Sequence, residues 1–241
     1  MVVRGGFGVP LGRDWYDADA LDVGPALVGK LLVRTDGRVG RIIEVEAYRG
    51  SEDPGSHAFR GETKRNATMF GPPGHLYVYF TYGMHWCANV VCGAEGIAQA
   101  VLVRALDPVA GLEAMRVARW GDGGGGPGGA RGGGSGGRGG GGTRGSGGRG
   151  AGGERERTGV RPDRDLCRGP ARLCQALGWD RALDGADLVT SDHGVRIVDD
   201  GAPPPAVVTT ARIGLRVAAD RPWRFVVPAS PWVSGPGVPV R

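Results

Sequence analysis

The order of apolar and polar residues predicts a β-hairpin at residues 69 to 92. An almost unbroken run of aromatic and β-branched residues follows a Gly-Pro-Pro-Gly turn there, a composition typical of strands bounded by turns. Tyr77 and Tyr79 are two residues apart and therefore point to the same side of a strand. We expect Tyr77 and Phe80 to be core residues, whereas Tyr82 falls at the turn, where a ring can project from the protein.

Two more strands are predicted at residues 31 to 34 and 40 to 47. The second alternates, and its apolar and polar faces consist of Ile43, Val45 and Ala47 and of Glu44, Glu46 and Tyr48, respectively. A face with two carboxylates is normally solvated. However, Arg104 is the one charged residue in the apolar run 98 to 105, and a buried arginine requires a carboxylate partner. Glu46 is the obvious partner.

The remaining elements follow from helical spacing, strand composition and chain breakers. The expected helices are residues 17 to 32, capped by Asp17 or Asp19, residues 111 to 120, and a helix that begins at Pro170 within residues 165 to 177. The expected strands are residues 88 to 92, 98 to 105, 209 to 217 and 223 to 227, with Asp107-Pro108 ending the strand that begins at residue 98. Residues 187 to 198 are expected to form strand and turn.

Composition separates one segment from the rest of the chain. Nearly half of the 48 glycines lie in residues 121 to 153, a low-complexity stretch with scattered arginine that cannot build a core. We interpret this stretch as a disordered insertion in a single domain formed by residues 1–120 and 154–241. It also carries more than half of the net charge of +5, so the rest of the chain would bind a polyanion only through a local patch.

The cysteines and histidines form no recognisable metal motif. Four residues of each type are present without a Cys-x-x-Cys pair, and we expect no metal site. The N-terminus lacks the apolar core of a signal peptide, and no apolar run is long enough to span a membrane. We therefore expect a cytoplasmic protein with reduced thiols and no membrane partner, and the excess of arginine over lysine favours a bacterial source.

A polar loop at residues 49 to 68 joins the alternating strand to the hairpin. Loops of this length in a compact domain are often functional. This one contains His57, followed by Arg60, Lys64 and Arg65. A lone loop histidine is usually only solvated, but the three basic residues, flanked by small ones, are suited to contact the phosphates of a nucleic-acid backbone.

Five segments follow one another along the chain. They are GRIIEVEAYRGSEDPGSHAFRG, TKRNATMFGPPGHLYVYFTYGMHWCANVVC, GPARLCQALG, RIGL and SPWVS. In this order they resemble the 3-methyladenine DNA glycosylase family, of the alkyladenine or methylpurine DNA glycosylase type, from about Trp15 to Ser234. The resemblance implies a single compact mixed α/β (α+β) domain around a curved antiparallel sheet, from which the Tyr82 hairpin protrudes.

The resemblance also implies an activity. Members of the family act in base-excision repair: they flip an alkylated, and in some cases a deaminated or etheno, purine out of double-stranded DNA and hydrolyse its N-glycosidic bond. An abasic site remains, and no cofactor is needed. We expect the same of this chain, acting as a monomer near the bacterial nucleoid. The roles implied by the family pattern are water activation by Glu46 and Arg104, a base pocket of Tyr48, His57, Tyr79 and Asn89, and filling of the duplex gap by Tyr82 with Met69 beside it.

These residue types suit that chemistry. Cleavage of an N-glycosidic bond develops oxocarbenium character at the sugar, which a carboxylate can stabilise while it takes a proton from water. An alkylated purine is cationic, leaves readily and is attracted to aromatic faces. The chain has only two lysines, Lys30 and Lys64, neither expected near the reacting sugar, so we expect no Schiff-base lyase step.

Two other functions remain open at this point. One is a non-catalytic nucleic-acid-binding protein that uses the arginine and glycine tract, and the other is a formyltransferase-like domain that binds RNA. Glu46 together with Arg104 favours the glycosylase, because a pure binder needs neither a buried carboxylate nor its arginine. The chain departs from the family pattern at Ala229, where the family often has glycine.

Overall fold

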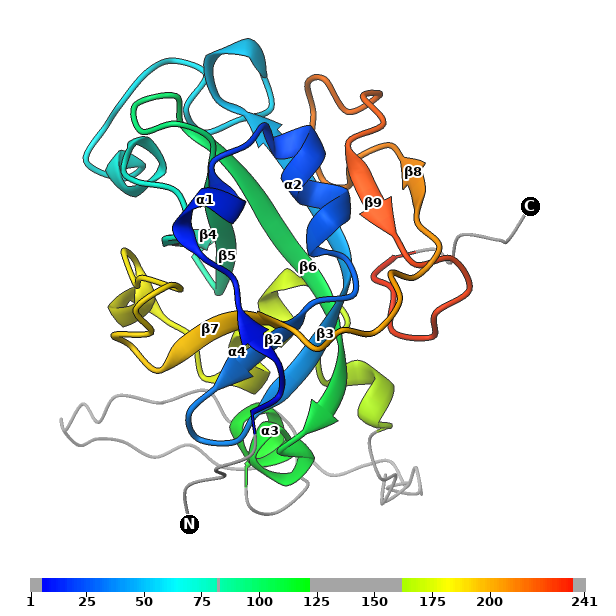
Figure 1. Cartoon of the computed structure of the whole chain (residues 1–241). Coiled ribbons are helices and arrows are strands. Elements are labelled where there is room, and N and C mark those ends of the chain that lie inside the picture. Colours follow the sequence, from blue (N-terminus) through cyan, green and yellow to red (C-terminus); the bar gives the residue numbers. More distant parts are fainter. Residues whose placement is uncertain (1–5, 82, 122–161, 236–241) are drawn as a thin grey trace, which may run out of the picture.

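A single antiparallel sheet is the centre of this computed structural model, which describes residues 6–81, 83–121 and 162–235. Its strands are β1 Val9–Pro10, β2 Leu31–Arg34, β3 Val39–Arg49, β4 Leu76–Thr81, β5 His85–Cys92, β6 Gln99–Ala110, β7 Val195–Asp199, β8 Val208–Thr210 and β9 Arg224–Val226. The order across the sheet is β1-β7-β2-β3-β6-β5-β4, and β9 pairs with β3 and β8. The sheet curls around its two longest strands, β3 and β6 (Figure 1).

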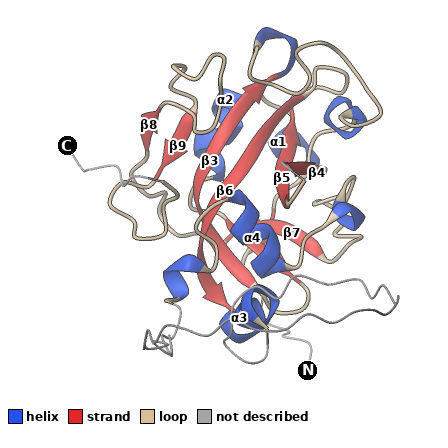
Figure 2. Cartoon of the chain, turned by 180° about the vertical axis from the view of Figure 1, so that it is seen from behind, coloured by secondary structure: helices blue, strands red, loops and turns tan. Residues whose placement is uncertain are grey.

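Short helices pack against this sheet. They are α1 Arg13–Tyr16, α2 Ala20–Leu27, α3 Leu112–Trp120 and α4 Pro170–Leu177. Helix α2 lies in front of the sheet in Figure 1, whereas α4 lies in front of it in the reverse view of Figure 2. The fold is therefore mixed α/β with a curled antiparallel sheet, as predicted. Among the helices of the described residues, none is long and apolar enough to cross a membrane.

Capping residues and prolines correctly predicted where two of the helices begin. Asp19 caps α2 by accepting a hydrogen bond from the Leu21 N–H at 2.9 Å, as predicted, although this helix is shorter than residues 17 to 32. Helix α4 begins at Pro170, where proline costs nothing because the first N–H groups of a helix lack intrahelical partners. The strands predicted at residues 31 to 34 and 40 to 47 and the hairpin are also present.

Strand β6 continues through Pro108, which we predicted would end it. In the pairing with β3, Pro108 lies opposite Gly40, and the strand runs on to Ala110. Strand β5 pairs with β6 near the opposite end, between Gln99 and Leu102. At Pro108 the missing N–H can therefore point away from β3, as at an edge position where proline is tolerated.

The strand predicted at residues 209 to 217 is also wrong beyond its first residues. Only Val208–Thr210 form β8, and the following segment leaves the sheet. Gly214 has a φ of +83°, which is incompatible with strand geometry. The irregular segment 211–223 that results lies beside β3, where it completes the site described below. Residues 187 to 198 contain turns followed by the strand Val195–Asp199, in agreement with the predicted strand and turn.

The main core lies between the sheet and the helices. Its largest fully buried aliphatic side chains include Leu27, Leu32, Ile42, Leu106, Leu173 and Leu177. Burying each stabilises the fold by roughly 1.5–3 kcal/mol. Tyr77 is 1% exposed, as predicted, but Phe80 is 43% exposed. Phe80 lies near the turn end of the hairpin, opposite Trp86, and packs against that ring with centroids 4.8 Å apart, so its outer face meets solvent.

Candidate active site

Charged side chains meet inside the protein next to a bulge in the pairing of β3 with β6. The register shifts between Ile42 and Glu44 and again between Glu44 and Val45, which bends the strand and interrupts the ladder. Glu44 and Glu46 are both 0% exposed. The polar face of this strand is therefore buried, and two carboxylates can be buried only if cations and hydrogen-bond donors compensate them.

Glu46 has three such donors. The Arg104 Nη1 atom lies 3.1 Å from its Oε2, and the Tyr48 hydroxyl donates to the same oxygen at 2.9 Å. The backbone N–H of Ile213, in the segment after β8, donates to Oε1 at 2.7 Å. The predicted pairing of Arg104 with Glu46 is thus confirmed. A carboxylate held by charge-assisted hydrogen bonds has a fixed direction and is suited to receive a proton from water.

Glu44 is a second buried acceptor, which sequence analysis did not assign to a site. Its Oε1 accepts from Arg104 Nε at 3.0 Å and from Arg224 Nε at 2.7 Å. Its Oε2 accepts from the backbone N–H of Ser234 at 2.6 Å. The alternation of β3 placed Glu44 on the face of Glu46, and this was the signal that could have identified it.

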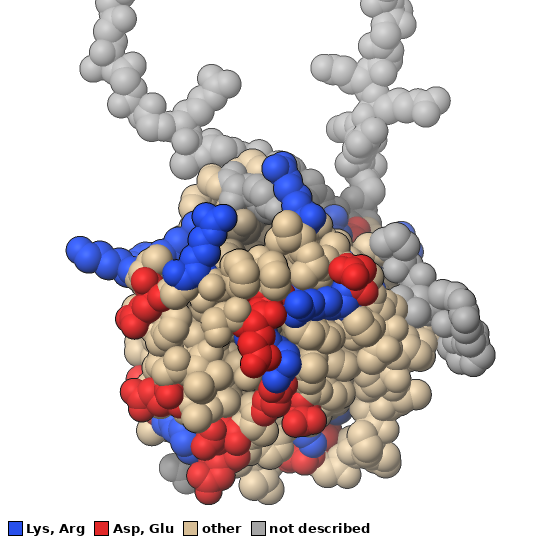
Figure 3. All heavy atoms as spheres, turned by 90° about the horizontal axis from the view of Figure 1, so that it is seen from above, with Lys and Arg blue, Asp and Glu red and all other residues tan. Residues whose placement is uncertain are grey.

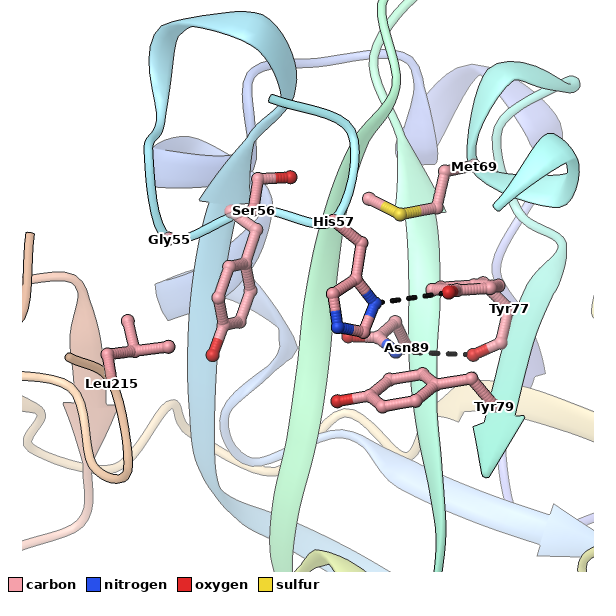
Figure 4. Close-up of a pocket in the computed structure, with 9 residues that line it drawn as sticks. Gly55, Ser56, His57, Met69, Tyr77, Tyr79, Asn89 and Leu215 are labelled. Atoms are coloured by element: carbon pink, nitrogen blue, oxygen red, sulfur yellow. Dashed lines mark hydrogen bonds between the residues drawn. The ribbon is translucent and has the colours of Figure 1, made fainter. Parts of the chain in front are cut away.

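A cavity opens next to Glu46. It is lined by Tyr48, Gly55, Ser56, His57, Met69, Tyr77, Tyr79, Asn89 and Leu215, and its empty volume is about 340 Å³, part of it open to solvent. The predicted pocket residues therefore come together from β3, the loop after it, and both strands of the hairpin (Figure 4). Because Tyr48 both lines the cavity and bonds to Glu46, the carboxylate lies directly behind the cavity wall.

Aromatic rings form one side of the cavity. Tyr77 and Tyr79 are stacked with centroids 5.2 Å apart, and His57 meets Tyr79 edge-on at 4.5 Å. The Nδ1 atom of His57 lies 3.1 Å from the Tyr77 hydroxyl, toward which the ring points in Figure 4. Flat, closely spaced rings of this kind are suited to hold a planar base by stacking.

The rings of the cavity wall are uncharged near neutral pH. Desolvation and, to a smaller extent, the charge of Arg65 lower the pKa of His57 from its ordinary value of 6.5. Burial raises the pKa of Tyr77 to about 12, and it also raises the pKa values of Tyr48 and Tyr79. A neutral aromatic wall does not repel a cationic alkylated base.

Asn89 and Met69 complete the wall. Asn89 is buried and donates from Nδ2 to the Tyr77 carbonyl at 3.2 Å, which fixes the orientation of its amide. Met69 is 3% exposed and lies in the cavity wall above His57 (Figure 4). The family pattern implied that Met69 lies beside the gap in the duplex. Its burial is more typical of a residue in the cavity wall.

Arg212 holds the irregular segment after β8 against the cavity. Its guanidinium bonds to both carboxylate oxygens of Asp53, at 2.5 and 2.8 Å, and to the Ala47 carbonyl at 3.0 Å. It also stacks on the Tyr48 ring, 4.7 Å from the centroid. Sequence analysis missed this pair, which brings the Ile213 N–H to Glu46.

The residues predicted to contact DNA outside the pocket are on the surface, and Arg65 lies next to the cavity wall, 5.7 Å from the centroid of the Tyr79 ring. Arg60, Lys64 and Arg65 are exposed, and Arg65 donates to the Phe80 carbonyl at 2.9 Å. Figure 3 shows the face formed by the loops at the top of Figure 1, where basic side chains project and acidic ones lie among them. This face has no uniform charge, so any phosphate contacts would be local.

Some of the predicted functional segments lie outside the described residues. They are Tyr82 and nearly all of the glycine-rich stretch 121 to 153. Met84, two positions after Tyr82, is 66% exposed, and the sequence pattern did not indicate a role for it. Among the described residues, no group of three or more His, Cys, Asp or Glu side chains is arranged to hold a metal ion.

Comparison with known proteins identifies the family of the chain. Residues 14–231 match the family model described as Methylpurine-DNA glycosylase (MPG). A protein of Burkholderia lata with the name "Putative 3-methyladenine DNA glycosylase" is 50% identical over 230 residues, which cover 95% of this chain and 93% of the relative. A protein of the same name from Streptomyces avermitilis is 42% identical, with coverage of 93% of this chain and 91% of the relative.

Proposed function

The chain belongs to the methylpurine-DNA glycosylase family and is a DNA glycosylase of base-excision repair; we propose that Glu46 activates the water that cleaves the N-glycosidic bond. The observation that supports this role is the burial of the Glu46 carboxylate behind the wall of an aromatic cavity, where Arg104 and the Ile213 N–H hold it. A protein that only bound nucleic acid would gain nothing from such a costly arrangement.

In the proposed reaction, Glu46 takes a proton from water as the water oxygen bonds to the anomeric carbon. The bond from that carbon to the purine breaks, and the purine leaves with the bonding electron pair. The negative charge of Glu46 stabilises the positive charge that develops on the sugar. Arg104 keeps the Glu46 carboxylate oriented. A fixed orientation of the reacting groups lowers the barrier, because less freedom of motion is lost on the way to the transition state.

The cavity is proposed to receive the damaged purine. Tyr48, His57 and Tyr79 would stack around it. Asn89 would select among purines by forming hydrogen bonds with the edge of the base. A cationic base gains cation–π attraction of roughly 0.5–2 kcal/mol from such rings. Extrusion costs a few kcal/mol, and stacking of about 1–3 kcal/mol per base offsets this cost. Alkylated purines are preferred over undamaged ones for two reasons. They gain the cation–π attraction, and extrusion costs least at a damaged or mispaired site.

Contacts outside the cavity are proposed to keep the base extruded. Tyr82 would occupy the gap in double-stranded DNA, and Arg60, Lys64 and Arg65 would contact phosphates beside it. The exposure of these three basic residues, and the position of Arg65 over the ring of the cavity residue Tyr79, support this arrangement. We further propose that the enzyme acts as a monomer at the nucleoid of a bacterial cell.

The test is an excision assay on duplexes that each carry one 3-methyladenine, hypoxanthine or 1,N6-ethenoadenine, followed by alkali. Wild-type protein should cause scission at the lesion and not at undamaged purines. Borohydride should trap no covalent adduct, because both lysines lie outside the cavity wall. Absence of scission on every lesion, or efficient trapping, would overturn the proposal.

A further inference from the structure

Glu44 is a buried carboxylate that has no role in the proposed reaction. It is 0% exposed and is not part of the cavity wall. Buried carboxylates are expensive and persist only when hydrogen bonds and cations compensate them. The contacts of Glu44 therefore indicate what it is there to hold.

Those contacts tie three separate parts of the chain to one side chain. Arg104 comes from β6, Arg224 from β9, and Ser234 from the segment after β9. Besides the backbone bond of Ser234, its hydroxyl donates to Glu44 Oε1 at 2.8 Å. Glu44 thus accepts hydrogen bonds from two guanidinium groups and from both donors of one serine.

Arg104 divides its three nitrogen atoms between different partners. Its Nε bonds to Glu44 at 3.0 Å, its Nη1 lies 3.1 Å from Glu46, and its Nη2 donates to the Ser234 hydroxyl at 3.3 Å. Two of the three contacts thus belong to Glu44 or to its own partner. Because a guanidinium is planar and rigid, these two contacts fix the direction in which Nη1 meets Glu46.

The charges of the group also depend on Glu44. The Arg224 Nε bonds to Glu44 at 2.7 Å, and its other nitrogens donate to the Thr210 hydroxyl and the Ser234 carbonyl. Glu44 is thus the carboxylate that compensates Arg224 and shares Arg104 with Glu46. Without its charge, two buried guanidinium groups would be left beside the single carboxylate of Glu46.

We propose that Glu44 is a positioning residue for hydrolysis, which acts through Arg104 and fixes the orientation of the Glu46 carboxylate. The inference rests on the proposed role of Glu46. Because Glu44 lies outside the cavity wall, we expect it to affect the rate of bond cleavage and not the binding of the lesion.

The experiment compares Glu44→Gln with wild type in single-turnover excision and in binding to a duplex with an uncleavable lesion analogue. The excision rate should fall about 10- to 100-fold, the range expected when a catalytic group is slightly misplaced, while the dissociation constant changes less than about twofold. In the Arg104→Ala background, Glu44→Gln should cause no further loss of rate, because residues that act through one another are not additive.

A matched control separates positioning from stability. Asp187 is a mostly buried carboxylate paired with Arg13 at 2.6 Å, and it lies outside the cavity wall. Asp187→Asn should lower the free energy of unfolding and leave the excision rate unchanged. An equal loss of rate in Asp187→Asn and Glu44→Gln, or an additive loss in the Arg104→Ala background, would overturn the proposal.

A second variant covers the case in which Glu44→Gln does not fold. Ser234→Ala removes the hydroxyl shared by Arg104 and Glu44 and keeps every charge, and it should slow excision about 3- to 10-fold. An unchanged rate would refute the inference. Glu46→Gln distinguishes the two proposals: if it abolishes excision while Glu44→Gln or Ser234→Ala does not slow it, only the positioning role fails.

Discussion

The Asp53 carboxylate and the Arg212 guanidinium form a fully buried, bidentate ion pair, with Nη1 to Oδ2 at 2.5 Å and Nη2 to Oδ1 at 2.8 Å. The pair links the loop after β3 to the segment after β8. It lies beside Gly55, where a Cβ would come within 2.9 Å of both Arg212 Nη2 and Leu215. The pair therefore packs directly behind Gly55 and Leu215, two residues of the cavity wall.

Replacing Arg212 with methionine should destabilise the protein strongly. The change leaves the Asp53 charge buried, with Arg221 as the next cation at 3.9 Å. Breaking one side of a buried pair costs about 3–5 kcal/mol. Urea unfolding should show this loss, and lesion binding should also weaken because Leu215 and Ile213 are no longer held. A loss below about 1 kcal/mol would mean that the pair does not anchor the segment.

His57 should make stability depend on pH below neutrality. Its pKa in the folded protein is lower than 6.5, so below pH 6.5 the unfolded chain binds more protons at this residue than the folded chain does. The contribution of His57 is therefore complete above about pH 6.5 and is lost as the pH falls through the folded-state pKa. His57→Gln should flatten the fall of the urea midpoint between pH 7.5 and 5; an identical fall in both proteins would contradict the pKa shift.

Ala229→Gly should stabilise the protein. Ala229 has a φ of +58°, in the left-handed region where a Cβ is unfavourable. Removing that strain exceeds the entropy that glycine adds to the unfolded chain, for a net gain of about 0.5–1 kcal/mol. The control is Ala114→Gly in the exposed interior of α3, which should lose about 1 kcal/mol. Thermal unfolding that shows losses in both variants would refute the strain argument.

Tyr82→Ala tests the proposed gap-filling residue. Excision from duplex DNA should fall more than excision from single strands, because single strands contain no gap to fill and no pairing to oppose extrusion. Phe80→Ala, at an exposed position in the same hairpin, is the matched control and should affect both substrates equally. Equal losses on duplex and single strands for Tyr82→Ala would exclude the role.

The sequence predicted those parts of the site that depend on local pattern. Arg104 within an apolar strand required a buried carboxylate, and Glu46 supplied it. By contrast, the pairing of Asp53 with Arg212 joins residues 159 positions apart, and no local periodicity reports such a contact. Glu44 and Glu46 are likewise buried because arginines and the segments after β8 and β9 cover them, and alternation alone could not distinguish such a face from a solvated one. The prediction for Pro108 was wrong because a strand accepts proline only where no neighbouring strand needs its N–H, and the sequence does not show which strands are neighbours.

The family resemblance carried the predictions that residues alone did not support. Tyr48, His57, Tyr79 and Asn89 come from separate strands and a loop, and they meet only because β3, β5 and β4 are brought together by β6. Their individual signals were weak, since a tyrosine on a strand is usually part of the core. Their convergence on one cavity is a property of the topology.

The most direct test of the account is single-turnover excision by Glu46→Gln, paired with binding to an uncleavable lesion analogue. Glutamine keeps the size of the side chain and an acceptor oxygen, but it cannot take a proton from water. The account predicts that excision falls by at least about 100-fold, with lesion binding within about threefold of wild type. Excision at the wild-type rate would contradict the role of Glu46 as the group that activates water.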